Sequence, residues 1–111
     1  AANVARAISE GKYERGVIIC GTGAGSAIVA NKFKGGDAVH CSNGFEAKRA
    51  MAVNNANVLV LAEWLTPGPH GVEITETWLN AEFGEGFAPE WQEFLKNCYT
   101  EIQEMENEVF Q

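Results

Sequence analysis

The chain has 111 residues, of which 46% are hydrophobic and 21% are charged. This length and composition predict one soluble globular domain and exclude a disordered tail or a multi-domain enzyme. The three cysteines, at positions 20, 41 and 98, lack the spacing of a metal site, so we expect no metal, no structural disulfide and a reducing cytoplasm. No apolar stretch approaches the roughly 20 residues that a membrane-spanning helix requires, so we expect no membrane association.

The net charge of −7 results from 15 acidic and 8 basic residues. This balance excludes a protein that binds the phosphate backbone, so we expect no nucleic-acid partner. The charge is also uneven: residues 1–50 carry seven basic and four acidic side chains, whereas residues 51–111 carry Lys96 against eleven acids. An anionic substrate would therefore be attracted to the first half of the chain or to a partner subunit.

Helices and strands are predicted to alternate along the chain. A helix over residues 2–9 comes first, and strands are expected at 16–20, 37–41 and 57–62, followed by helices at 24–33, 44–53 and 71–83. The three strand segments are short, apolar and bounded by Gly or Asn, which is typical of parallel strands buried on both faces. The order predicts an α/β fold of the Rossmann-like, three-layer α/β/α class, and residues 66–71 are predicted to form a rigid turn.

Residues 89–108 place apolar side chains at spacings of three and four, which predicts an acidic amphipathic helix. We therefore divide the chain into an α/β portion, 1–88, and a helix, 89–111, that belongs to the same domain or to a dimer interface. Three strands are fewer than a usual sheet of this class contains. We expect either that a preceding strand and helix are missing from this sequence or that another subunit completes the sheet.

The strongest local signal is Cys20-Gly-Thr-Gly-Ala-Gly25, between a predicted strand and a predicted helix. Ligands bind at this position in open parallel sheets, and glycines permit close approach. Three interpretations stay open: an oxyanion or phosphate cradle, a tight turn, and a dinucleotide site, although the Gly-x-G-x-x-G spacing is not met. Cys20 favours catalysis, because a thiolate at this position can act as a nucleophile or a base.

Other candidate side chains receive structural interpretations. Cys41 and Cys98 are expected to be inert packing residues. His40 alternates with apolar neighbours, so we expect a buried histidine whose hydrogen bonds are satisfied. His70 follows Pro69 and is expected on an exposed turn.

Five motifs together resemble the ribose-5-phosphate isomerase B and galactose-6-phosphate isomerase family. They are Gly16-Val-Ile-Ile-Cys-Gly-Thr-Gly-Ala-Gly25, Ala30-Asn-Lys-Phe-Lys-Gly35, Cys41-Ser, Asn54-Asn-Ala-Asn-Val-Leu59 and Trp78-Leu-Asn-Ala-Glu-Phe83. The resemblance runs without an obvious gap over about residues 2–86, whereas the acidic tail from Phe87 onward is poorly covered.

The resemblance implies aldose–ketose isomerisation through an enediolate, with no cofactor. It implies that Cys20 is the base that moves a proton between C1 and C2, that Thr22 handles a proton on a sugar oxygen, and that Asn54 contacts the sugar. Backbone N–H groups of the loop would stabilise the oxyanion, namely those of Gly21, Gly23, Ala24 and Gly25. It also implies a site built across a homodimer or a higher homo-oligomer.

Three positions depart from the family pattern. The histidine associated with ring opening is Val53 here, and two arginines that bind phosphate are Trp64 and Phe87. One hypothesis is an isomerase of a different substrate, either acyclic or without phosphate, with Trp64 stacking on the sugar or packing at a subunit interface. The alternative is a catalytically silent subunit that binds a sugar or a partner.

Overall fold

The computed structural model describes residues 1–110, which form three parallel strands and five helices. Strands β1 (Gly16–Cys20), β2 (Ala38–His40) and β3 (Val58–Ala62) lie in the order β1-β3-β2. Cys20 is paired with Ala62 and His40 with Val60, so all three strands end at one edge of the sheet. We call this the carboxyl edge, and the opposite one the amino edge.

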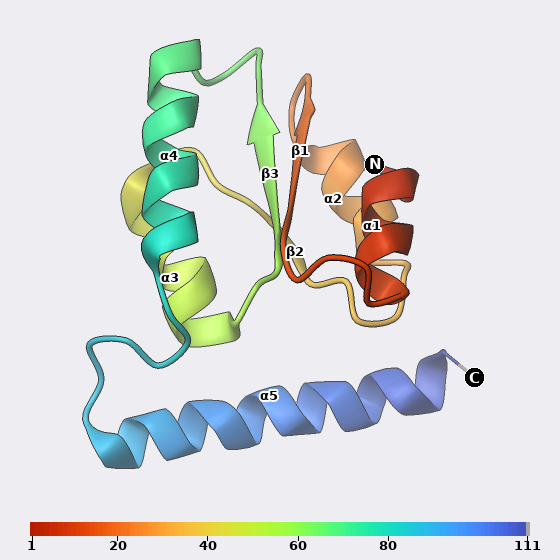
Figure 1. The fold of residues 1–111 in the computed structure, drawn as a ribbon, viewed down its shortest axis with the longest axis vertical. Helices are drawn as coiled ribbons and strands as arrows, with labels where there is room; N and C mark the ends of the chain where they lie inside the picture. Colours follow the sequence, from red (N-terminus) through yellow and green to blue (C-terminus); the bar gives the residue numbers. More distant parts are fainter. Residues whose placement is uncertain (111) are drawn as a thin grey trace.

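Helices cover both faces of this sheet, as the sequence predicts (Figure 1). Helices α1 (Ala2–Ser9) and α2 (Ala24–Ala30) pack on one face, with a cluster that includes Ile18 and Val58. Helices α3 (Gly44–Asn54) and α4 (Gly68–Asn80) cover the other face, around a cluster that includes Leu59. The three-layer α/β/α prediction is therefore confirmed.

The core depends most on β3 and on Trp78 of α4. All five residues of β3 are buried, and the Trp78 indole is fully buried and donates to the carbonyl of Ala56 at 3.1 Å. Arg15 stacks on this indole, 5.3 Å from the ring centroid, and donates hydrogen bonds to the carbonyls of Trp78, Leu79 and Ala81. Arg15 thus satisfies the carbonyls that the end of α4 leaves free.

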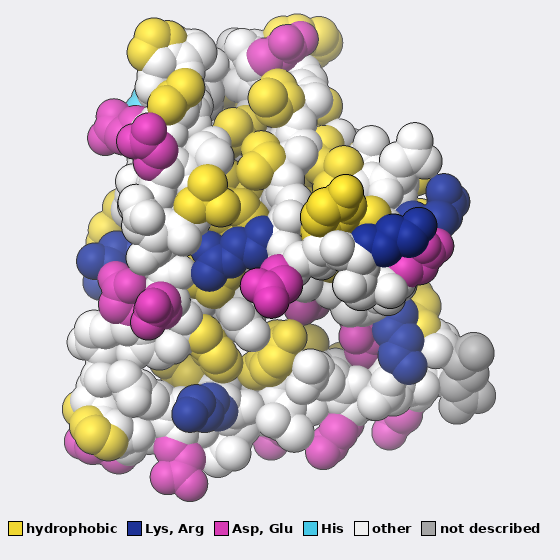
Figure 2. Space-filling view, in the orientation of Figure 1, with side chains coloured by type: hydrophobic (Ala, Val, Ile, Leu, Met, Phe, Trp, Pro, Cys, Tyr) yellow, Lys and Arg dark blue, Asp and Glu magenta, His cyan; other side chains and the backbone are white. Residues whose placement is uncertain are grey.

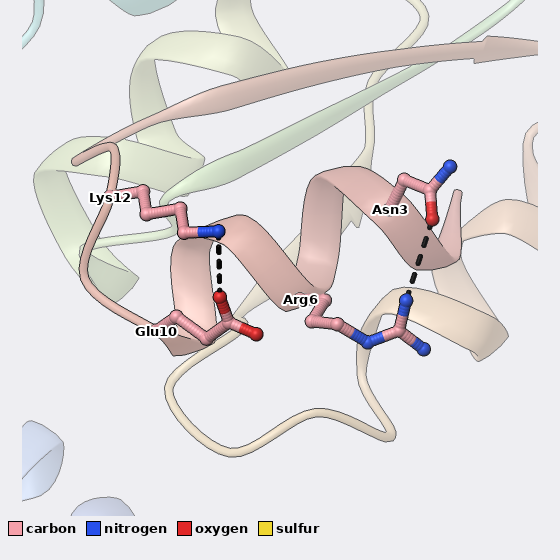
Figure 3. Close-up of polar contacts among 4 residues, drawn as sticks. All are labelled: Asn3, Arg6, Glu10 and Lys12. Carbon is pink, nitrogen blue, oxygen red and sulfur yellow. Dashed lines mark hydrogen bonds and ion pairs between the residues drawn. The ribbon is translucent and has the colours of Figure 1, made fainter.

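Two polar contacts lie on helix α1 and on the turn that follows it (Figure 3). Arg6 donates to Asn3 at 3.4 Å, and Lys12 forms a 3.0 Å ion pair with Glu10. Such exposed contacts contribute little to stability. The helix is held instead by buried apolar residues such as Ala5 on its other side.

Helix α5 (Pro89–Val109) runs across the amino edge of the sheet (Figure 1). It buries no residue, and its apolar side chains, such as Phe94 and Met105, are about half exposed. Acidic side chains are spread along its outer side in Figure 2. No helix among residues 1–110 is long and apolar enough to cross a membrane.

The structure corrects the predicted turn at residues 66–71. Helix α4 begins at Gly68, with Pro69 in its first turn, because proline is compatible with the first residues of a helix. His70 therefore lies in a helix and not in a turn. The same helix ends at Asn80, three residues before the predicted end, because Ala81 adopts an extended conformation.

Strand β1 lies at the end of the strand order, and its apolar side chains on the face toward α4 are exposed. Val17 and Ile19 line a groove of about 520 Å³ between β1 and α4, where apolar side chains gather in Figure 2. The expectation that another strand and helix, or another subunit, complete this sheet stays a prediction.

Candidate functional site

The loop that joins β1 to α2 forms the centre of the candidate site at the carboxyl edge. Gly23 has φ of +85°, a conformation that other residues rarely adopt, and this turn lets α2 begin at Ala24. The turn folds the chain back so that backbone N–H groups surround the end of β1. The side chain of Cys20 lies in this curve and is half-buried.

Hydrogen bonds from the loop favour the thiolate form of Cys20. The Ser26 hydroxyl makes the largest contribution, and together with the backbone N–H groups of Ser26, Gly23 and Thr22 it lowers the pKa of the Cys20 thiol. The Gly23 N–H donates to the sulfur at 3.2 Å. A cysteine with a lowered pKa can remove a proton near neutral pH.

Ser26 is a functional candidate that the sequence analysis missed. It lies six residues after Cys20, in the first turn of α2, where a side chain can face back toward the end of β1. The sequence shows a serine directly after the glycine loop. Its contact with the cysteine could not be predicted, because it depends on the turn at Gly23.

The other predicted loop residues differ in what their N–H groups contact. The Gly23 N–H is engaged by the Cys20 sulfur, and the Ala24 N–H lies 3.4 Å from the Thr22 hydroxyl oxygen. Thr22 is exposed at the mouth of the loop, and the surroundings of Gly25 are open. The loop therefore donates a hydrogen bond to the sulfur, and the oxyanion role of these N–H groups stays a prediction.

Trp64 lies directly against the same loop. Its backbone N–H donates to the carbonyl of Gly21 at 3.1 Å, and the backbone N–H of Glu63 donates to the carbonyl of Cys20 at 2.8 Å. A methyl group added to Gly21 would lie 2.9 to 3.0 Å from three carbons of the Trp64 indole. The indole thus covers Gly21 with one side and remains 75% exposed, which leaves an aromatic surface beside Cys20.

Asn54 lies far from this loop within one chain. It is the last residue of α3, which begins after the carboxyl edge and ends at the amino edge (Figure 1). There Asn54 lines a cavity of about 150 Å³ together with Asp37 and Tyr99. The structure therefore does not bring Asn54 and Cys20 together in a single copy.

Cys41 and His40 lie in different environments from that of Cys20. Burial raises the pKa of the Cys41 thiol to about 11, with a further effect from Glu46, which fits an inert packing residue. The expectation for His40 was wrong: its Nε2 atom is buried without a hydrogen-bond partner among the described residues. Within residues 1–110, no group of three His, Cys, Asp or Glu side chains is arranged to hold a metal ion.

Comparison with known proteins identifies the family of this chain. The sequence profile of the ribose/galactose isomerase family matches residues 1–93. The chain belongs to this family. Its curated relatives include the 4-deoxy-4-sulfo-D-erythrose isomerase of Clostridium sp. (strain MSTE9), 40% identical over 96% of this chain and 67% of the relative. Another is the D-erythrulose-4-phosphate isomerase of Pectobacterium atrosepticum, 43% identical over 91% of this chain and 65% of the relative.

Solved structures agree with this assignment. The ribose-5-phosphate isomerase B of Clostridium thermocellum matches with a TM-score of 0.85 and 36% identity, over 96% of this chain and 68% of that structure. The chain thus spans about two thirds of the length of these relatives. Matches over 96% of the chain extend beyond residue 86 and into α5, farther than the motifs alone indicated.

These relatives confirm the expected family and fold, and they are named as sugar isomerases. The alternative of a catalytically silent subunit receives no support from them.

Proposed function

We propose that this chain forms part of an aldose–ketose isomerase in which Cys20 is the base. The hydrogen-bonded Cys20 thiol, with its lowered pKa at the carboxyl edge of the sheet, is the observation that carries the proposal. In the forward direction, the thiolate takes the proton from C2 of the aldose, and the electrons of that bond form an enediolate. The Cys20 thiol then returns the proton to C1 while the hydroxyl proton moves from the C2 oxygen to the C1 oxygen, which yields the ketose and regenerates the thiolate.

Three other groups would assist this transfer. The exposed Thr22 hydroxyl exchanges protons with the sugar oxygens, and backbone N–H groups of the 21–25 loop stabilise the negative charge on the enediolate. Trp64 offers its exposed indole face to the C–H side of the sugar. Each group lies beside Cys20 in the structure, so no large rearrangement is needed.

We further propose an open-chain substrate. The position at which the family carries its ring-opening histidine is Val53, which cannot donate a proton. A four-carbon aldose closes a five-membered ring only through its C4 oxygen. The relatives named above act on four-carbon sugars whose C4 carries a sulfonate or a phosphate ester, and such sugars have no free C4 hydroxyl for ring closure.

Charge then favours the sulfonate over the phosphate. A phosphate dianion needs several charge-assisted donors, whereas a sulfonate carries a single negative charge. Two positions at which the family places arginine are Trp64 and Phe87 in this chain. We therefore propose a 4-deoxy-4-sulfotetrose as the preferred substrate, converted to the corresponding 2-ketose.

Asn54 enters this proposal through a second copy of the chain. Since Asn54 and Cys20 lie at opposite edges of the sheet, one sugar can contact both only if they come from different copies. We therefore propose a homodimer in which Asn54 of one copy completes the site of the other. The three unpaired thiols fit the reducing cytoplasm in which we place the enzyme.

A substrate panel combined with one substitution tests the proposal. We expect kcat/KM for 4-deoxy-4-sulfo-D-erythrose to exceed that for D-ribose 5-phosphate by about a hundredfold and that for D-erythrose 4-phosphate by about tenfold. Cys20→Ala should lower kcat by about a thousandfold, whereas Cys98→Ala serves as the matched control. Efficient turnover of ribose 5-phosphate would refute the substrate assignment, and an active Cys20→Ala variant would refute the base.

A further inference from the structure

The imidazole of His40 lies beneath the catalytic loop. His40 is the last residue of β2, and β3 separates it from β1 in the sheet. A methyl group added to Gly23 would lie 2.5 Å from His40 Cδ2, 2.9 Å from Cγ and 3.1 Å from Nε2. The edge of the imidazole thus occupies the space that a side chain at position 23 would need.

The polar atom on this edge has no partner. His40 Nε2 is buried, and it neither accepts nor donates a hydrogen bond among the described residues. An unsatisfied buried nitrogen is unfavourable, and most buried polar groups avoid it. A histidine that only filled the core could be replaced by an apolar side chain without this disadvantage, so the contact with the loop gives the residue a different role.

The contact is connected to Cys20 through a single residue. Gly23 rests on the His40 ring, and the Gly23 N–H donates to the Cys20 sulfur at 3.2 Å. Any movement of Gly23 toward β2 would lengthen this hydrogen bond. Because Nε2 is buried beneath Gly23, the contact through which His40 affects the thiol is the one with Gly23.

We propose that His40 is a positioning residue of the site, whose imidazole edge supports Gly23 and holds its N–H against the Cys20 sulfur. This inference rests on the proposed function, because the position of Gly23 matters for catalysis only if Cys20 is the base. The effect of the contact on the reactivity of the thiol can be measured without a substrate. A charged group on the helix that follows β2 is Glu46 of α3, whose pKa is lowered mainly by hydrogen bonds from Ser42 and to a smaller extent by His40.

The test measures the reactivity of Cys20 without any substrate. Iodoacetamide is reacted with the whole chain from pH 5 to 10, and peptide mass spectrometry reports the alkylation of each cysteine. For His40→Ala we expect Cys20 to react roughly three to ten times more slowly at pH 7, with its pH profile moved to higher pH. Alkylation of Cys98 should not change, and His70→Ala serves as the matched histidine control.

A double-mutant cycle covers the possibility that His40→Ala perturbs the fold. Gly23→Ala would push against the ring, so its effect on Cys20 alkylation should be smaller in the His40→Ala background. Circular dichroism verifies that each variant is folded. An unchanged Cys20 profile in folded His40→Ala, or additive effects in the cycle, would overturn the proposal.

The alkylation test of His40 and the activity test of the proposed function can fail independently of each other. If Cys20→Ala kept full isomerase activity, the function of the site would be refuted while the alkylation result for His40 still stood. If His40→Ala left Cys20 reactivity intact, only the positioning role would be lost.

Discussion

The two edges of the sheet differ in how complete their chemistry is within one chain. At the carboxyl edge, β1, the glycine loop and the segment after β3 meet, so Cys20, Ser26 and Trp64 lie around one point. At the amino edge, Asn54 lies beside Asp37 and under α5, a helix that buries none of its residues. This difference is the basis of our proposal that the carboxyl edge holds the reacting groups and that Asn54 acts in the site of another copy.

Charge follows the same division. At the carboxyl edge, hydrogen bonds lower the pKa of Cys20 and so favour its negative form. At the amino edge, burial and the nearby Glu106 raise the pKa of Asp37, which disfavours its negative form. The loop thus stabilises a thiolate at the carboxyl edge, whereas the surroundings of Asp37 disfavour its carboxylate at the amino edge.

Complementation between two inactive variants gives the largest expected effect. Cys20→Ala and Asn54→Ala should each lose most activity as pure dimers, because each lacks one half of every site. Mixing and re-equilibrating them should restore about a quarter of wild-type activity, since half of the dimers are mixed and each has one intact site. If the mixture stays inactive while mixed dimers form, Asn54 does not complete the site of the other copy.

Ser26→Ala sharpens the account of the carboxyl edge. Without the hydroxyl, the thiolate loses its largest stabilising contact, so the pKa of Cys20 rises. Since the base must be deprotonated, activity should rise with pH in both proteins. In the variant this rise should occur at higher pH, and kcat at pH 7 should be roughly tenfold lower. Ser42→Ala, which removes a hydroxyl from another loop, is the control. A superimposable pH–rate profile would contradict the role of Ser26.

Trp64→Ala gives the smallest expected effect of the three. Its indole is 75% exposed, so we expect the thermal stability to change little. Loss of the aromatic face should raise KM roughly three- to tenfold with kcat nearly unchanged. Trp91→Ala, which removes a half-exposed tryptophan from α5, is the matched control. A dimer that dissociates in Trp64→Ala would instead assign the indole to the subunit interface.

Much of the fold could be predicted because its signals are local. Strand β1 and helix α1 have the predicted bounds. A continuous apolar run identifies the strand, and an amphipathic pattern identifies the helix. The start of α4 was missed because Pro69 and its neighbouring glycines indicate a turn locally, although proline also suits the first turn of a helix. The tertiary environment decides between these two.

The candidate site could be predicted only in part. The glycine loop identified Cys20, but the contacts of Ser26 and His40 with this loop depend on the turn at Gly23 and on the strand order. The separation of Asn54 could have been anticipated. An eleven-residue helix that begins at the carboxyl edge is about 16 Å long and ends near the other edge.

Solvent hydrogen exchange tests the central claim most directly. The chain and the sulfotetrose are incubated in D2O, and NMR follows deuterium at the carbon that receives the proton. We predict that the wild-type chain incorporates deuterium during isomerisation and that Cys20→Ser, still folded and still binding the sugar, incorporates none above the uncatalysed background. Exchange at the wild-type rate in Cys20→Ser would contradict the assignment of Cys20 as the base.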